Sequence, residues 1–225
     1  FPTRRSSDLE ELRALRDIVK KNNLFLFADE AYREFCYDGA SHLSAMNLEG
    51  IEDNTILIDS VSKRYSECGI RIGALISRNR EIIQSALRFA QARLSPPGLG
   101  KIAGEASIDT PPEYFQEVNR EYTARRNFMV DALNSMPGVY CPRPKGAFYT
   151  VASLPVDDAD RFATWLLKDF SHRNQTVMIA PASGFYSTPG LGKNEARIAY
   201  VLNTTDLGNA METLSEALKA YPGRI

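Results

Sequence analysis

Apolar residues recur at helical spacing in several segments of the chain. In the first of them Leu12, Leu15, Ile18 and Val19 are separated by polar residues, which makes one face of a helix apolar. The same kind of pattern recurs four more times along the chain. The predicted helices cover residues 10–22, 81–92, 114–134, 159–170 and 206–220.

Short apolar runs without helical spacing alternate with these helices. The run LFLFA ends at Asp29 and the run TILI ends at Asp59, as is typical of strands buried on both faces. Because helix and strand alternate in the first half, we expect an α/β layer with a mostly parallel sheet. The predicted strands are 24–28, 55–58, 72–77, 146–151, 176–180 and 196–202.

The pattern also divides the chain into three parts. Residues 1–9, FPTRRSSDL, resemble the translation of an adapter oligonucleotide, and we expect a non-native leader or, alternatively, a flexible basic one. Residues 10–136 are expected to form one domain that ends with the long helix. The pattern of residues changes after this helix, and residues 137–225 are expected to form a second, smaller domain. The SPPGLG segment at 95–100 indicates a loop.

Composition excludes several classes of function. Among 225 residues, 27 Lys and Arg balance 28 Asp and Glu, so the net charge of −1 gives no reason to expect a nucleic-acid partner. No apolar run approaches the roughly 18 residues of a membrane span. Three cysteines without CxxC spacing and two histidines indicate neither a disulfide framework nor a metal site. We therefore expect a cytoplasmic protein.

The most informative segment for chemistry is DSVSKRYSECGIRIG, which follows a predicted strand. Ser60, Ser62 and Arg71 bring two hydroxyls and a guanidinium to one loop, a set that suits a phosphate group. Lys63 adds a primary amine that could pair with the phosphate or form a Schiff base with a carbonyl. The alternative is a solvated polar loop with an ordinary surface lysine.

Two further segments carry candidate binding residues. Asp29 ends an apolar strand in ADEAYR, so a buried carboxylate there must be paired, for example with a protonated heterocyclic nitrogen. The alternative is a helix cap, with Glu30 and Arg33 on the surface. Arg197 lies in the apolar segment EARIAYVLN and could bind a carboxylate from within a cleft. Its alternative is an edge position from which it reaches water.

In this order, ADEAY, S-x-S-K-x5-G-x-R, GAFY and a late AR resemble the class I/II aminotransferases of the fold-type I pyridoxal-phosphate enzymes. The resemblance runs from residue 10 to the C-terminus and is greatest to a bacterial aspartate-aminotransferase-like subgroup. It implies an α/β fold: part of the large, mostly parallel-sheet domain of fold-type I enzymes, followed by the C-terminal α+β small domain.

The resemblance also implies roles around pyridoxal 5'-phosphate (PLP). Lys63 would hold the cofactor covalently and then transfer the proton. Asp29 would pair with the pyridinium nitrogen, so that the ring accepts electrons. Tyr32 would hydrogen-bond the cofactor's phenolic oxygen.

The remaining implied roles concern anions. Ser60, Ser62 and Arg71 would hold the cofactor's phosphate, and Arg197 would bind the substrate α-carboxylate. No metal is implied.

The implied activity is transamination between an amino acid, aspartate as the first expectation, and a 2-oxo acid, 2-oxoglutarate, in a homodimeric full-length protein. Because the family's upstream half supplies further cofactor and dimer contacts, we expect this chain alone to be impaired. Two alternatives stay open: another PLP reaction on the same fold, such as C–S β-lyase or decarboxylase chemistry, or a non-catalytic sensing module.

Overall fold

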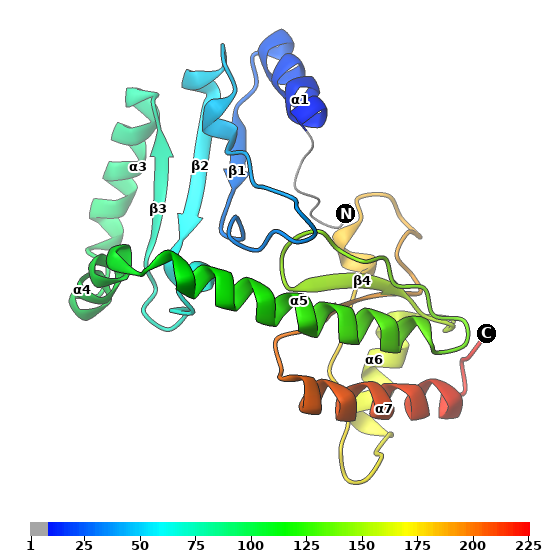
Figure 1. Ribbon diagram of the computed structural model, residues 1–225. Helices are drawn as coiled ribbons and strands as arrows, with labels where there is room; N and C mark the ends of the chain where they lie inside the picture. The colour runs from blue at the N-terminus through cyan, green and yellow to red at the C-terminus, as the bar shows by residue number, and fades with distance from the viewer. Residues whose placement is uncertain (1–8) are drawn as a thin grey trace. The chain divides into compact units, whose positions relative to one another are not determined.

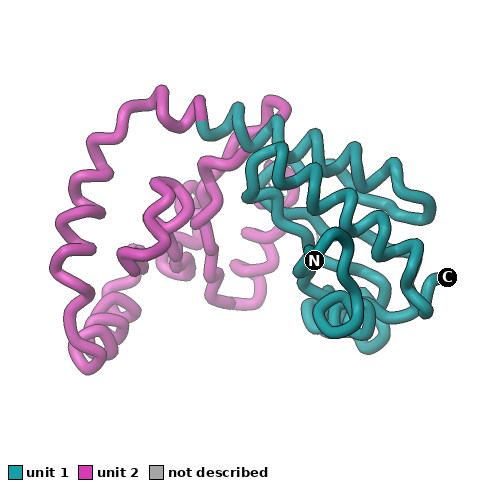
Figure 2. The backbone as a smooth tube through the Cα atoms, turned by 90° about the horizontal axis from the view of Figure 1, so that it is seen from below, with its two compact units in different colours: residues 1–4, 118–225 teal, residues 5–117 magenta. Residues whose placement is uncertain are grey.

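The computed structural model describes residues 9–225, so the expected leader lies outside the described residues apart from Leu9. The described chain forms two compact units, residues 9–117 and Val118–Ile225 (Figure 2). The division falls inside the long helix α5 (Pro112–Asn134). None of the described helices is both long and apolar enough to cross a membrane.

The first unit contains a three-stranded sheet in the order β1-β2-β3 (Figure 1). β1 is parallel to β2 and β3 is antiparallel to it, so the described sheet contains one parallel and one antiparallel pair. The elements of this unit before α5 are α1 (Leu9–Asn22), β1 (Leu26–Asp29), η1 (Ala45–Asn47), η2 (Glu52–Asn54), β2 (Thr55–Ser60), α2 (Val61–Arg64), β3 (Gly73–Ser77), α3 (Arg80–Arg93), α4 (Gly98–Ala106) and η3 (Ser107–Asp109).

The expectation that the first strand is buried on both faces is wrong. Leu12 and Val19 of α1 are buried in a small cluster against which Leu26 and Ala28 pack. Alternate residues of a strand face opposite sides, and Phe27 is 67% exposed. Among the described residues β1 therefore buries one face only.

The SPPGLG segment also differs from the expected loop. Its last three residues form the first turn of α4, which Pro97 precedes at the N-cap position. A Cβ added at Gly100 would lie 2.5 Å from the carbonyl oxygen of Ile70. The glycine therefore allows the helix to approach the segment before β3 very closely, and this close packing explains a glycine inside a helix.

The second unit is an α+β domain around an antiparallel sheet in the order β4-β6-β5. Its core is continuous and includes Met129 and Leu133 of α5, Phe162 and Leu166 of α6, and Leu214 of α7. The elements after α5 are β4 (Tyr149–Ser153), α6 (Ala159–Lys168), β5 (Ala180–Pro181), η4 (Ser183–Phe185), β6 (Glu195–Ala199) and α7 (Thr204–Ala220).

The unit boundary lies earlier than residue 136, where the sequence placed it. Met129, Val130 and Leu133 are almost fully buried within the core of the second unit. The C-terminal part of α5 thus belongs to the core that follows it, which the amphipathic pattern of one uninterrupted helix does not reveal.

Candidate active site

Lys63 lies half-buried in α2, a single helical turn directly after β2. Ser60 is the N-cap of this turn, and its Oγ accepts a hydrogen bond from the amide of Ser62 at 3.1 Å. The same Oγ lies 2.9 Å from Ser62 Oγ and 3.2 Å from the carbonyl oxygen of Ile72. The serine pair noted in the sequence therefore begins the turn that carries the lysine.

An open pocket of 360 Å³ brings three of the predicted residues together, since Ser60, Ser62 and Arg71 all line it. Arg71 has a φ of +58° and donates from Nη1 to the carbonyl oxygen of Cys68 at 2.9 Å. Arg93, at the end of α3, also lines the pocket. Two guanidiniums and two hydroxyls suit an anion of phosphate size, and the carboxylate of Asp59, which also lines the pocket, accepts hydrogen bonds from Arg64. The motif gave no signal for Arg93, because it lies on a later helix.

The two carboxylates at the end of the first strand differ in burial from the expectation. Asp29, which was expected to be buried, is exposed, and its Oδ1 accepts from the amide of Ala31 at 3.1 Å. The buried carboxylate is Glu30, at 5% exposure, which contradicts the alternative that placed it on the surface. The alternation of side chains along an extended chain places these two carboxylates on opposite sides. Tyr32 follows in the turn, with its ring edge-on to Phe35 at 6.2 Å.

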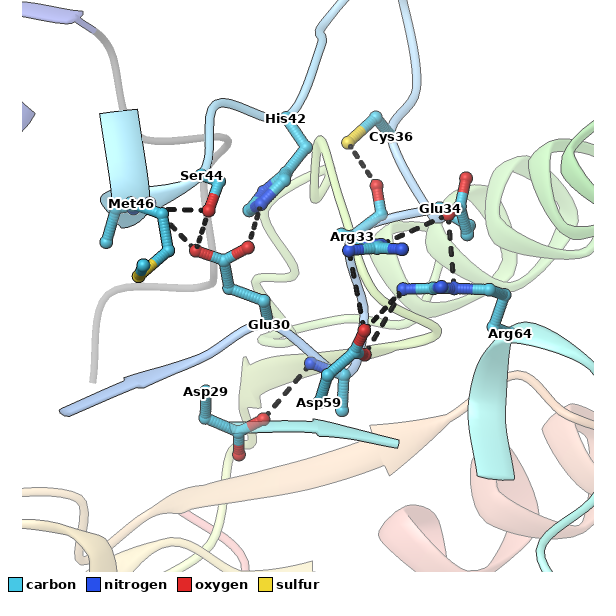
Figure 3. Close-up of polar contacts among 12 residues, drawn as sticks. Asp29, Glu30, Arg33, Glu34, Cys36, His42, Ser44, Met46, Asp59 and Arg64 are labelled. Atoms are coloured by element: carbon cyan, nitrogen blue, oxygen red, sulfur yellow. Dashed lines mark hydrogen bonds and ion pairs between the residues drawn. The ribbon is translucent and has the colours of Figure 1, made fainter. Parts of the chain in front are cut away.

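Glu30 is the centre of a hydrogen-bond cluster that sequence reasoning missed (Figure 3). Its two carboxylate oxygens meet Nε2 of His42 at 2.8 Å, Oγ of Ser44 at 2.9 Å and the amide of Ala45 at 2.8 Å. Burial raises the pKa of Glu30, but these hydrogen bonds outweigh it and hold the pKa below its ordinary value. The cluster fastens the loop before η1 to the end of β1.

Four charged side chains form a second cluster that the sequence did not indicate (Figure 3). Nη2 of Arg64 donates to both oxygens of Asp59, at 2.8 and 3.2 Å, and Nε of Arg64 lies 3.2 Å from Glu34 Oε1. Arg33 lies 3.4 Å from Asp59 and 3.3 Å from Glu34. These contacts connect the turn after β1 to β2 and α2.

Arg197 lies in the other compact unit, on the central strand β6. Its side chain is exposed rather than buried, and because β6 is the central strand the edge-position alternative is wrong. The guanidinium lies 5.4 Å from the ring centroid of Tyr149 and 5.1 Å from that of Phe185. Cation–π contact with two rings holds the exposed charge on this face of the sheet.

Comparison with known proteins settles the family. The family model for aminotransferases of class I and II matches residues 2–214. The chain belongs to this family. Its members depend on PLP.

Relatives among aminotransferases show the same relationship. The chain is 28% identical over 222 residues to the aspartate aminotransferase of Pyrococcus horikoshii, a match that covers 97% of this chain and 54% of that protein. It is 29% identical to an aspartate aminotransferase of Rhizobium meliloti, covering 93% of this chain and 52% of the relative. The chain thus spans about half the length of the curated relatives it matches.

Solved structures confirm the predicted fold class. The crystal structure of an aromatic aminotransferase from Pyrococcus horikoshii superposes with a TM-score of 0.83 at 27% identity, covering 95% of this chain and 56% of that one. The aspartate aminotransferase from Rhizobium meliloti gives a TM-score of 0.80 at 26% identity, covering 94% and 54%. The chain has the partial fold-type I architecture that its motifs implied.

The residues present fit the family cofactor. Hydroxyls and guanidiniums line one pocket, as a phosphate group requires. Lys63 directly follows Ser62 on the same helical turn but is not among the residues that line the pocket; its primary amine is the group with which an aldehyde would react.

Proposed function

We propose that this chain carries the lysine-bearing part of a PLP-dependent aminotransferase site. The observation that carries the proposal is the arrangement after β2, where Ser60, Ser62 and Arg71 line one pocket and Lys63 follows on the same turn. Membership of the class I and II aminotransferase family supports the same chemistry.

In this proposal the phosphate of PLP is bound by Ser60, Ser62 and Arg71. The two serines lie at the start of the helical turn α2, and Arg71 lies in the following loop, where it donates a hydrogen bond to the carbonyl oxygen of Cys68. Lys63 would hold the cofactor through Nζ and, once the substrate amine has displaced it, would move the proton of the substrate Cα. When bound, PLP supplies an electron-accepting ring that stabilises negative charge at that carbon.

The remaining residues would orient the ring and the substrate. The carboxylate of Asp29 pairs with the protonated ring nitrogen, and Tyr32 donates its hydroxyl to the ring oxygen. Arg197 binds the α-carboxylate of the substrate through its planar guanidinium. The exposure of Asp29 and Arg197 in the described chain is consistent with both groups receiving a ligand.

We further propose aspartate and 2-oxoglutarate as the substrates; the names of the aspartate aminotransferases from Pyrococcus horikoshii and Rhizobium meliloti support aspartate as the donor. An aromatic-amino-acid aminotransferase of Thermococcus litoralis is 29% identical, so an aromatic amino donor is the competing substrate. A homodimeric assembly and a cytoplasmic location complete the proposal, the latter supported by three free cysteines. Because the chain spans about half of its relatives, we expect it to bind PLP weakly on its own.

The decisive experiment traps PLP on the chain. Borohydride reduction in excess PLP, followed by peptide mass spectrometry, is expected to place the label on Lys63. Lys63→Ala should lose that label, while Lys168→Ala, which changes an exposed lysine of α6, should keep it. Label spread evenly over surface lysines, or unchanged in Lys63→Ala, would contradict the proposal.

A second measurement distinguishes the reaction type. With aspartate as donor, transamination converts 2-oxoglutarate into glutamate in equal amounts. An aromatic donor that replaces aspartate with higher activity would correct the substrate assignment. Release of ammonia without amino transfer would instead indicate lyase chemistry.

A further inference from the structure

The four-residue cluster of Asp59, Arg64, Arg33 and Glu34 spans two elements that the chain separates widely. Asp59 lies near the end of β2 and Arg64 at the end of α2, whereas Arg33 and Glu34 lie in the turn after β1 (Figure 3). The side chains of Arg64 and Asp59 are only 12% and 15% exposed, and those of Arg33 and Glu34 are 34% exposed. Partly buried charge pairs of this kind are screened less by solvent than surface pairs.

The cluster has balanced charge and an asymmetric geometry. Two guanidiniums meet two carboxylates, and Arg64 is the member that touches both acids. Arg64 donates hydrogen bonds to both oxygens of Asp59 but meets Glu34 as an ion pair only, since its buried Nε has no hydrogen-bond partner among the described residues. Arg33 and Arg64 pair with these carboxylates and do not line the anion pocket, whose lining cations are Arg71 and Arg93.

The residues next to this cluster are those that need fixed positions. Lys63 directly precedes Arg64, and Tyr32 directly precedes Arg33. The helix α2 is one turn long, and such a turn gains little stability from its own hydrogen bonds. Side-chain anchors are therefore required to hold it.

We infer that Arg64, together with Asp59, Glu34 and Arg33, is a positioning device that fixes the turn bearing Tyr32 against the helix bearing Lys63. The role of this cluster in PLP binding rests on the proposed function. The coupling between the turn that bears Tyr32 and the helix that bears Lys63 does not depend on that function. Arg64 acts through its neighbours and touches no reacting atom in this scheme.

Hydrogen exchange of the chain without cofactor tests the coupling. The amides of Arg33 and Phe35 are protected by hydrogen bonds to Glu30 and Tyr32. In Arg64→Met, we expect the peptide covering 30–38 to exchange about tenfold faster, because the turn loses the ion pair between Glu34 and the partly buried Arg64. Arg88→Met, which removes an exposed arginine from α3 of the same unit, should exchange like the unsubstituted chain. Equal exchange in the two variants would overturn the inference.

Two further variants keep the test decisive where Arg64→Met does not fold. Glu34→Gln removes the ion pairs of Glu34 with Arg33 and Arg64 and should accelerate exchange in the peptide covering 59–72 as well as in its own turn. Arg64→Lys keeps the charge without the fork and should restore part of the protection. Unchanged exchange around α2 in Glu34→Gln would overturn the coupling.

PLP affinity separates positioning from plain structural support. Tyr32→Phe should weaken PLP binding in the unsubstituted chain but have a smaller effect in the Arg64→Met background, because Tyr32 is then no longer held in place. Additive effects would overturn the positioning role. Accelerated exchange in a chain that does not bind PLP would support the coupling and contradict the proposed function.

Discussion

The two compact units bury their apolar side chains to very different degrees. In the unit from Val118 onward, three helices and a sheet enclose one continuous core, with Phe162 and Leu166 fully buried. In residues 9–117 the buried apolar cluster is small, and Phe27, Phe89 and Leu99 are 67%, 78% and 84% exposed.

The less well packed unit is nevertheless the one that carries Lys63 and the anion pocket. Its candidate site is held by helix caps, a carboxylate cluster around Glu30 and the Arg64 ion pairs. The comparison teaches that apolar packing stabilises the second unit, whereas directional polar contacts determine the site geometry in the first. Regions with few buried apolar contacts open more readily.

The largest expected effect lies in the well packed core. Leu166→Ala should lower the free energy of unfolding by about 2–5 kcal/mol, because it removes a fully buried side chain and leaves a cavity. Its neighbour Leu167 is 56% exposed, and Leu167→Ala should stay within about 0.5 kcal/mol. Urea unfolding followed by the fluorescence of the single tryptophan, Trp165, reports this unit because Trp165 packs beside Phe162. Equal losses in the two variants would contradict the described core.

A second substitution tests close packing in the first unit. Gly100→Ala places a methyl group 2.5 Å from the carbonyl oxygen of Ile70, so α4 must shift, at a cost of about 1–3 kcal/mol. Because Arg71 follows Ile70, phosphate binding at the pocket should weaken as well. Gly98→Ala meets no atom within 4 Å and should raise helix stability slightly. Thermal unfolding followed by circular dichroism and phosphate titration distinguish the two, and identical behaviour would argue against the close approach.

The carboxylate cluster predicts a pH dependence. The pKa of Glu30 is held below its ordinary value in the folded chain, so its stabilisation is present above the unfolded pKa and is lost as the pH falls through the folded pKa. Glu30→Gln should therefore cost about 1–3 kcal/mol at neutral pH, since the buried donors lose their carboxylate, and less in acid. Hydrogen exchange around Ala45 checks this, with Glu49→Gln, an exposed neighbour, as the control. A cost that stays constant as the pH falls would contradict this account of Glu30.

The sequence predicted these features unevenly, for physical reasons. Helical periodicity located α1, α3, α5, α6 and α7, because each buries one stripe of apolar residues. The Ser60 to Arg71 pocket residues were predicted because one loop carries them all. In LFLFA, by contrast, apolar residues occupy successive positions, so the pattern could not indicate that Phe27 is exposed while Ala28 packs inward.

Contacts between residues that are far apart in the chain could not be predicted from the sequence. Glu30 meets residues twelve to fifteen positions away, and Arg64 meets Glu34 from another element, so no local spacing signals either contact. The helix α4 was missed because glycine and proline usually mark loops, whereas here Gly100 serves a close approach to Ile70. Tertiary contacts, rather than local propensity, determine these positions.

The smallest effect on stability is expected for substitution of Arg197. This substitution distinguishes a role in substrate binding from a role in folding. Arg197→Met removes cation–π contacts with Tyr149 and Phe185 on an exposed sheet face, worth about 0.5–1 kcal/mol. Trp165 fluorescence in urea should show a change of that size, similar to the change in Arg161→Met on the exposed side of α6. If Arg197 binds the substrate carboxylate as proposed, the variant should lose the response of the PLP-loaded protein to aspartate while Arg161→Met keeps it. A large stability loss with an intact response to aspartate would instead assign Arg197 a structural role, because an arginine held for binding contributes little to folding when its charge is already solvated.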